Sequence, residues 1–244
     1  MNIPVQKSRQ KPSSSRRRNG HASNGTIDEL VINGSAHIPH WVIDHESFRR
    51  WARSNAFPER GQFFYLDGTF WVDLSMETLI HNQIKNAILI VLGSIVTNEA
   101  LGRVLGDRMM LTHPGAGLSC EPDLMFIANA SLHDGAVILR EGNTSLEVEG
   151  SPDMALEVVS KSSVQKDTVA FKELYARAAI AEYWIVDSTA EKPELVIYRL
   201  TDGKYLTVRR QDGWVKSKVF GRSFRLTSRK DAQGMSQFEL EIKA

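Results

Sequence analysis

The most regular pattern of apolar residues in the chain lies between residues 75 and 100. Apolar side chains recur there at intervals of three and four residues, namely at Ile80, Ile84, Ala87, Ile88, Val91 and Ile95. This spacing matches the turn of an α-helix and predicts a long helix with one buried face. Ser75 precedes the pattern, in the position of a typical helix N-cap. We therefore expect a helix that begins after Ser75 and ends near residue 100.

Shorter apolar runs have the length and the flanking turn residues of β-strands. The run "QFFYLDGTFWVDLS" contains two aromatic segments around Asp67-Gly68, which is the turn chemistry of a β-hairpin. Further along, "RVLGDRMML" and "EPDLMFIA" are predicted strands on either side of the glycine-rich loop "HPGAGLS". Residues 129–151 are expected to be irregular, with one more strand. "PDMALEVVS" is the next clear strand, and the strongly apolar "EYWIVD" is expected to be central in its sheet.

The remaining predicted elements complete an α/β pattern. "DHESFRRWARS" places Phe48 and Trp51 on one side of a short helix. Ser162 or Ser163 is expected to cap a helix to about residue 179, with an apolar side made of Phe171, Leu174, Tyr175 and Ala178. Three more strands are predicted near residues 194–200, 204–210 and 215–220, with turns at Asp202-Gly203 and Asp212-Gly213. The order is helix, strands, helix, strand and then a meander.

Composition narrows the class of protein. The chain has 244 residues, of which 42% are hydrophobic and 24% charged, and this is enough for one substantial core. Its longest apolar stretch, residues 87–96, is far shorter than the roughly 20 residues that a membrane-spanning helix needs. The amino terminus lacks the apolar segment of a secretory signal, and the single Cys120 cannot form an internal disulfide. We therefore expect a cytoplasmic protein with no membrane partner.

Charge is distributed unevenly along the chain. The first 27 residues contain six basic and no acidic residues, so with +1 overall the rest of the chain carries −5. A basic segment of low hydrophobicity buries too little apolar area to offset the entropy of ordering it. We expect residues 1–26 to be a disordered basic tail and residues 27–244 to form one domain. The tail could hold phosphate backbones or could be a dispensable, solvated terminus.

Acidic residues mark two of the predicted strands. In "PDMALEVV", Asp153 and Glu157 point to one face of an extended strand, while Met154, Leu156 and Val158 point to an apolar core. Asp123 begins the strand "DLMFI", where an ionised carboxylate is costly to bury without a partner. Carboxylate oxygens from neighbouring strands are ligands that magnesium prefers. Acidic residues at strand ends also commonly face solvent or cap loops, so the spacing alone leaves both interpretations open.

Three quoted segments occur together in the order of a known nuclease family. "YLDGTFWVDLSMETLIHNQIK", "EPDLMFI" and "GSPDMALEVVSKSSVQKDTVAFKELYARAAIAEYWIVD" resemble the Uma-type restriction endonuclease family, which is placed in the PD-(D/E)xK nuclease superfamily. The resemblance covers roughly residues 62–213. It implies a restriction-endonuclease-like core, with a mixed central sheet flanked by helices and added antiparallel strands. It also implies hydrolysis of DNA phosphodiester bonds, with Asp123 and Glu157 as ligands of magnesium or manganese.

The resemblance is incomplete at the lysine that such nucleases use. The superfamily pattern places this lysine at Val159, and the Uma-type pattern places it at Phe171. Lys161, Lys166 and Lys172 lie nearby and are the candidates for its role, each with the alternative of an ordinary surface lysine. An acidic residue usual in the first hairpin is also replaced, by Phe64.

A polar stripe on the long helix adds one more candidate. Glu77, His81 and Lys85 recur every four residues, and His81 matches a histidine typical of the family. His81 could therefore contact a phosphate or a metal-bound water, or could be a packing residue. Asp153 is expected to end its strand or to orient a lysine, and Asp167 to cap its helix. Cys120 has neither the histidine partner nor the cysteine spacing of a nucleophile or a zinc ligand.

The leading hypothesis is a magnesium-dependent endonuclease that acts on DNA, with Asp123 and Glu157 as ligands and a helix lysine assisting. One alternative is a nuclease-derived module with a nucleic-acid-binding or regulatory role. In that case the missing lysine reflects the loss of catalytic activity. Another is an enzyme that hydrolyses phosphodiesters other than nucleic acids. By analogy with endonucleases that cut both strands, a homodimer is expected.

Overall fold

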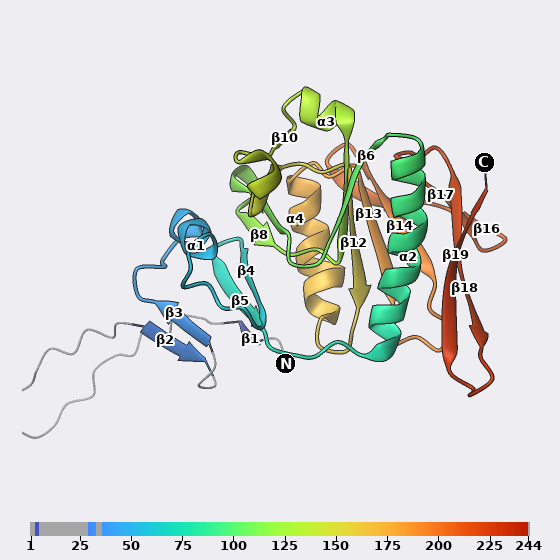
Figure 1. Ribbon diagram of the computed structural model, residues 1–244, viewed down its shortest axis with the longest axis horizontal. Helices are drawn as coiled ribbons and strands as arrows, with labels where there is room; N and C mark the ends of the chain where they lie inside the picture. The colour runs from blue at the N-terminus through green and yellow to red at the C-terminus, as the bar shows by residue number, and fades with distance from the viewer. Residues whose placement is uncertain (1–2, 5–28, 33–35, 244) are drawn as a thin grey trace, which may run out of the picture.

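The computed structural model describes residues 3–4, 29–32 and 36–243 (Figure 1). The basic tail predicted over residues 1–26 lies outside the described residues, except for the short strand β1 (Ile3–Pro4). The helices are α1 (His45–Ala52), α2 (Leu79–Asn98), α3 (Asn129–His133) and α4 (Phe171–Arg177). A π-helical segment, η3 (Lys166–Ala170), leads directly into α4, and η1 (Pro114–Ala116) and η2 (Gly142–Thr144) are single 3-10 turns.

A mixed six-stranded sheet lies at the centre of the fold. Its strands are β6 (Gly102–Gly106), β9 (Leu124–Ala128), β12 (Met154–Val159), β13 (Glu182–Asp187), β14 (Leu195–Thr201) and β15 (Lys204–Thr207). They are ordered β15-β14-β13-β12-β9-β6. β12 and β13 are parallel, whereas β12 and β9 are antiparallel. The central position predicted for "EYWIVD", which is β13, is confirmed.

Three other sheets surround this one. A seven-stranded sheet has the order β1-β5-β4-β8-β7-β11-β10 and adds β4 (Gln62–Leu66), β5 (Thr69–Asp73), β7 (Met110–His113), β8 (Leu118–Cys120), β10 (Val137–Ile138) and β11 (Glu147–Gly150). A four-stranded antiparallel sheet contains β16 (Arg210–Gln211), β17 (Trp214–Lys216), β18 (Ser223–Lys230) and β19 (Ser236–Lys243). β2 (Glu29–Ile32) and β3 (Ala36–Pro39) form a separate pair. The predicted mixed α/β architecture with added antiparallel strands is confirmed.

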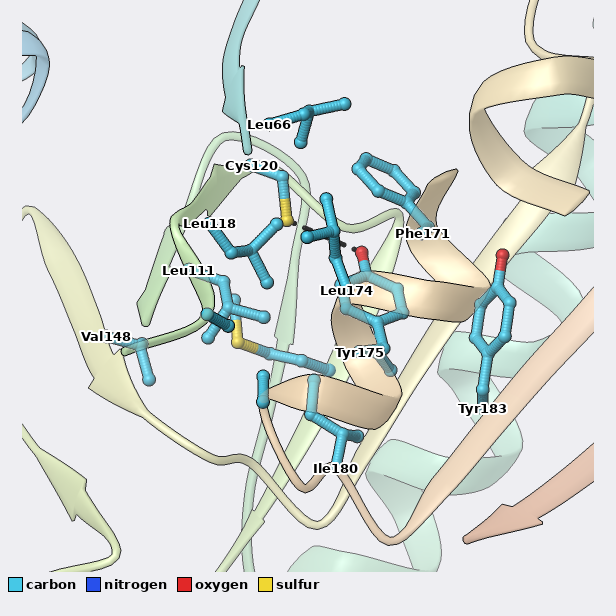
Figure 2. Packing of buried hydrophobic residues seen from close by; sticks show 14 of the residues in the cluster. Leu66, Leu111, Leu118, Cys120, Val148, Phe171, Leu174, Tyr175, Ile180 and Tyr183 are labelled. Atoms are coloured by element: carbon cyan, nitrogen blue, oxygen red, sulfur yellow. Dashed lines mark hydrogen bonds between the residues drawn. The ribbon is translucent and has the colours of Figure 1, made fainter. Parts of the chain in front are cut away.

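Helices cover both faces of β12, which stands between α4 and α2 in Figure 1. Met154, Leu156 and Val158 pack with α2 and with the β18–β19 hairpin. Ala155 and Val159 pack on the opposite side with α4 and residues of the seven-stranded sheet, part of which Figure 2 shows. We expected one face of this strand to be core and the other to present carboxylates. That expectation is wrong for most of the face, because every residue of β12 is buried.

Helix α2 begins later than its apolar pattern predicts. Its N-cap is Thr78, whose Oγ1 accepts a hydrogen bond from the backbone N–H of His81 at 3.3 Å. Ser75 instead donates its backbone N–H to Asp73 and lies before the helix. α2 is also the one described helix long and apolar enough to cross a membrane by composition. Its apolar face packs on the central sheet through Ile84, Ile88, Leu92, Ile95 and Val96, as expected of a core helix.

The position of this cap can be tested by mutation. Thr78→Ala is expected to lower the free energy of unfolding by about 0.5–1 kcal/mol, because one N–H of the first turn loses its acceptor. Ser75→Ala is the matched control and should change stability by less than about 0.5 kcal/mol. Urea denaturation followed by circular dichroism measures both. If Ser75→Ala lowers the free energy of unfolding as much as Thr78→Ala or more, the helix begins after Ser75, as the sequence pattern predicts.

Two other predictions about strands need correction. The run "RVLGDRMML" is not one strand, because the chain turns at Asp107 and Arg108 and divides it between β6 and β7 in different sheets. Arg108 has a φ of 68° there, so the turn uses a backbone conformation that is rare for a residue with a side chain. Residues 129–151 contain α3 and two strands rather than one. The hairpin turns at Asp67-Gly68, Asp202-Gly203 and Asp212-Gly213 are confirmed.

Candidate active site

An acidic cleft opens where α2, β9, β12 and the β6–β7 turn meet. Its volume is about 260 Å³. Asp123 and Glu157 both line it, together with His81 and Lys166. The cleft therefore brings together four of the five site residues predicted from the sequence.

Asp123 lies immediately before β9 and is buried against β12. Because the two strands are antiparallel neighbours, its Oδ2 accepts the backbone N–H of Val158 at 2.7 Å. The same oxygen lies 3.4 Å from Nε2 of His81. Burial alone would raise the pKa of Asp123, but the contacts with His81 and Val158 outweigh it and the pKa lies below its usual value. Asp123 is therefore held as a carboxylate at the wall of the cleft.

Glu157 reaches the cleft from the middle of β12. Its Oε1 accepts a hydrogen bond from the hydroxyl of Tyr175 at 2.7 Å, and its Oε2 lies 3.9 Å from Nζ of Lys166. Burial raises the pKa of Glu157 well above its ordinary value; Lys166 opposes this, and the negative charges of Asp167 and Asp123 add to it. Asp123 and Glu157 are thus close enough to repel one another. Such a pair of carboxylates gains when a cation lies between them.

Lys166 is a buried lysine, with 4% of its surface exposed. Its Nζ donates to Oδ1 of Asp167 at 2.5 Å and faces Glu157. Burial would lower the pKa of Lys166, but Asp167 and Glu157 together raise it above the ordinary value. The π-helical turn matters here, because Lys166 and its neighbour Asp167 are both buried toward the sheet. Single π-helical turns of this kind often occur at functional sites.

His81 connects Asp123 to a second acidic residue. Its Nδ1 lies 3.6 Å from Oε2 of Glu77, which is one turn earlier on the chain. Burial would lower the pKa of His81, but the contacts with Asp123 and Glu77 raise it overall. One ligand atom each from Glu77, His81 and Asp123 lies within 4.8 Å of the other two. These three residues therefore have the spacing of a metal-ligand set.

Lys85 is the third member of the polar stripe and holds Glu77 in place. It is buried, and its Nζ donates to Glu77 Oε1 and to Asp107 Oδ2, at 2.5 Å in each case. Glu77 and Asp107 were not identified as site residues from the sequence. The spacing of Glu77, His81 and Lys85 pointed to the first of them, whereas Asp107 reaches the cleft only through the fold of the β6–β7 turn.

The donor set fits a hard divalent cation. Carboxylate oxygens from Asp123 and Glu77 are ligands that magnesium and manganese prefer, whereas the imidazole nitrogen of His81 favours a transition metal such as manganese over magnesium. Nδ1 of His81 is buried and has no hydrogen-bond partner among the described residues. A polar atom in that condition gains free energy from binding a ligand.

Comparison with known proteins places this chain in a nuclease family. The model of the Uma2 family, described as "Putative restriction endonuclease", matches residues 45–228. The chain belongs to the Uma2 family. A solved "putative nuclease belonging to DUF820" from Anabaena variabilis has the same fold, with a TM-score of 0.54 and 15% identity. The match covers 73% of this chain and 91% of that one. No curated protein matches the chain.

Phe64 and Phe171, the two residues at which the sequence departs from the pattern that the resemblance implies, lie next to each other in the fold. The rings of Phe64 and Phe171 lie 5.9 Å apart, edge to face. Nζ of Lys166 lies 5.0 Å from the centre of the Phe64 ring and 4.2 Å from that of Phe171. Two aromatic rings therefore support the ammonium group of Lys166 through cation–π contacts. Phe171 therefore occupies the position at which the resemblance predicts a lysine, and the lysine that lines the cleft is Lys166.

The other candidate lysines lie elsewhere. Nζ of Lys172 is 4.0 Å from the centre of the Tyr198 ring, away from the cleft, so its predicted place in the site is wrong. Lys161 is exposed and does not line the cleft. Lys172 is excluded from the cleft by its position on α4. Phe171 and Tyr175 occupy the buried side of this helix, and Lys172 points away from it.

Asp153 lies directly before β12, at the end of its strand, which was one of its two expected roles. It contacts no lysine of the described residues and accepts hydrogen bonds from the backbone N–H of Ala128 at 2.7 Å and from the hydroxyl of Ser131, and so joins α3 to the end of β9. Asp167 does not cap a helix but pairs with Lys166. Cys120 is buried beside the hydroxyl of Tyr175 (Figure 2), and burial raises the pKa of its thiol, which fits a packing role.

Proposed function

We propose that this Uma2 protein is a divalent-metal-dependent endonuclease that hydrolyses phosphodiester bonds in DNA. The observation that carries the proposal is the meeting of Asp123, Glu157 and Lys166 in one cleft, although they come from two strands and a helical turn. Membership of the Uma2 family supports a nuclease, which is the reaction class that we assign to the cleft.

Asp123 and Glu157 are the ligands that we assign to magnesium or manganese, with His81 and Glu77 beside Asp123. When bound, the cation supplies charge stabilisation to the phosphoryl oxygens during attack by water. Lys166 stays protonated, because neighbouring carboxylates raise its pKa. Its ammonium group can therefore hold a phosphoryl oxygen on which negative charge builds up. Asp167 and the rings of Phe64 and Phe171 fix that ammonium in position.

The remaining predictions about partners are not decided by the fold. DNA as the substrate, a homodimer and a cytoplasmic location stay predictions. The net charge of −5 outside the first 27 residues limits nonspecific attraction to DNA, and the basic residues before Asp28 would offset part of it. Removal of residues 1–26 should weaken DNA binding more at low than at high salt.

A supercoiled-plasmid assay tests the proposed function. The wild type is expected to nick or linearise plasmid with magnesium or manganese and to stop when the metal is chelated. Asp123→Asn and Glu157→Gln should each lower the rate by about 100-fold, since each removes one charged ligand and keeps the shape of the side chain. Glu141→Gln, an exposed acidic residue outside the cleft, is the matched control.

The outcomes separate the competing functions. Cleavage that is equal in wild type and both cleft variants would reject the proposed site. Metal binding without cleavage of any substrate would favour the nuclease-derived binding module. Turnover of small phosphodiesters without cleavage of plasmid, and with no effect of removing residues 1–26, would favour an enzyme that acts on other phosphodiesters.

A further inference from the structure

The segment from Lys204 to Lys230 is strongly basic, and the proposed mechanism does not use it. It contains nine lysine and arginine residues and one acidic residue, Asp212, so its formal charge is +8. Residues 28–244 together carry −5, which leaves −13 for the rest of that range. The segment forms β15, β16, β17 and β18, the last three of which belong to the carboxy-terminal sheet. The fold therefore gathers positive charge along one edge of an otherwise acidic structure (Figure 1).

Most of these cations have no acidic partner within the described part of the chain. Arg210, Arg222 and Arg225 each pair with a glutamate. The other six form no ion pair with a described residue, namely Lys204, Arg209, Lys216, Lys218, Arg229 and Lys230. Like charges on one surface repel one another, so an anion that lies over them lowers the free energy of the surface.

The carboxy-terminal sheet buries one face and exposes the other. The residues of its buried face pack in the core with α2 and are Val215, Phe224, Leu226 and Leu240. Because side chains alternate along a strand, the residues between them lie on the outer face. The cations of this outer face are Lys216, Arg225, Arg229 and Lys243. All of them except Arg225 are exposed.

Two carboxylates and one aromatic ring share the outer face. Glu241 lies opposite Arg225 and pairs with it, and Glu239 lies opposite Thr227, so the cations of the face outnumber its carboxylates. The charged groups of Arg225 and Lys243 lie 4.6 and 4.5 Å from the centre of the Trp214 ring. This ring holds two long side chains in place, which reduces the entropy that they lose on binding a ligand.

The row of cations is long enough to follow a nucleic acid duplex. Ser223 on β18 pairs with both Lys216 and Lys243, and Arg229 lies at the other end of the same strand. At about 3.3 Å per residue, the distance along β18 from Ser223 to Arg229 is about 20 Å. Each strand of a duplex carries one phosphate per 3.4 Å of its axis, so the row spans about six base pairs.

This row ends on the side of the molecule where the cleft opens. The turn between β18 and β19, which follows Arg229 and Lys230, lies at the lower edge of Figure 1, as does the amino end of α2. α2 and β19 pack on one another. Glu77, Thr78 and His81, at the amino end of α2, line the cleft. A duplex that leaves the cleft past α2 on this side therefore meets the basic end of β18.

We propose that the outer face of the carboxy-terminal sheet is a second DNA-binding surface, which holds the phosphate backbone of duplex DNA outside the cleft through Lys216, Arg229 and Lys243. The inference rests on the proposed function for the identity of the polyanion, since DNA is the substrate assigned to the cleft. Contacts with phosphates position a duplex and carry no sequence preference of their own. The acidic residues that line the cleft repel a polyanion, and this surface supplies the attraction that the cleft lacks.

The variant Lys216→Gln with Arg229→Gln tests this surface in the full chain. Both side chains are exposed, and neither forms a hydrogen bond or an ion pair with another described residue. Arg103→Gln with Lys192→Gln is the matched control, because it removes two exposed positive charges elsewhere. Fluorescence anisotropy of a labelled duplex of about 30 base pairs, in chelator, measures affinity against salt concentration. The outer-face variant should reduce the slope of log affinity against log salt by about 2, and the control by less than about 0.5.

Plasmid cleavage gives a second readout. Neither Lys216 nor Arg229 lines the cleft, so the outer-face variant should raise KM about 10-fold or more and leave kcat unchanged. Because the anisotropy measurement needs no metal and no cleavage, absence of plasmid nicking by the wild type would reject the proposed function and still leave the salt slope to decide this surface.

Three results would overturn the proposal. Equal salt slopes for the outer-face and control variants would mean that only the net charge of the chain matters. A lower kcat with an unchanged KM would place these residues in the reaction and not in binding. Binding of the wild type to vesicles of anionic lipid but not to the duplex, weakened in the outer-face variant, would identify a membrane-binding surface instead.

Discussion

The double substitution Lys166→Met with Asp167→Asn is expected to lower the rate of DNA cleavage by about 100- to 1000-fold while the chain stays folded. Among the described residues, Lys166 holds the one ammonium group that lies against Glu157 in the cleft, so methionine removes the charge and keeps most of the side-chain volume. Plasmid cleavage at saturating manganese measures the rate. Circular dichroism and the unfolding midpoint establish that the fold is retained.

The second substitution keeps the test interpretable. Lys166→Met alone leaves Asp167 and Glu157 buried without their cation, which costs about 3–5 kcal/mol and can unfold the chain. Asp167→Asn removes one of those two negative charges and has its own single variant for comparison. Lys172→Met is the matched lysine control, since Nζ of Lys172 lies over the ring of Tyr198 outside the cleft. A double variant that cleaves as fast as Lys172→Met would remove Lys166 from the mechanism.

Trp184→Ala is expected to lower the free energy of unfolding by about 3–5 kcal/mol. Trp184 on β13 is fully buried, and its ring meets those of Phe220 and Phe224 at 5.6 and 5.0 Å. Its Nε1 donates to Oε2 of Glu182. The substitution opens a cavity between the central sheet and the carboxy-terminal strands. Guanidinium denaturation followed by circular dichroism measures the loss.

Trp214→Ala provides the contrast for this experiment. Trp214 lies on β17, half-buried, with the charged groups of Arg225 and Lys243 over its ring. Its removal forfeits cation–π contacts and some packing, at a cost of about 1 kcal/mol. Both tryptophans are aromatic and apolar in the sequence, and their different burial follows from the sheets to which they belong. If Trp184→Ala lowers the free energy of unfolding by less than Trp214→Ala does, the carboxy-terminal strands are not packed on β13.

Local patterns were sufficient for most helices and strands of the core. The three- and four-residue spacing in α2, the Asp-Gly turns and the apolar run of β13 report interactions between residues close in the chain. Asp123 and Glu157 also followed from local pattern and family resemblance. Patterns failed where two elements shared one run, as when the turn at Asp107 and Arg108 divided "RVLGDRMML" between two sheets. Residues 223–243, which form β18 and β19, were not predicted as strands at all.

Which lysine serves the cleft could not be determined from spacing. Spacing left Lys166 and Lys172 as the candidates for the site, with Lys161 nearby. In the structure Lys166 is buried in the π-helical turn, whereas Lys172 lies over the ring of Tyr198. Phe64 and Phe171 looked like lost functional groups in the sequence. In the fold they lie together beneath the ammonium group of Lys166.

The sequence by itself determined the class of fold, the two strands next to which Asp123 and Glu157 lie, and the nuclease family. Each of these follows from short segments of residues that are neighbours in the chain. The tertiary structure alone decided that Asp107 and Glu121 join Asp123 in one cleft and that Lys85 braces Glu77. The physical reason is that charge in a buried site acts over a few ångströms of space. Residues far apart in the chain share such a site only after the sheets and α2 have packed.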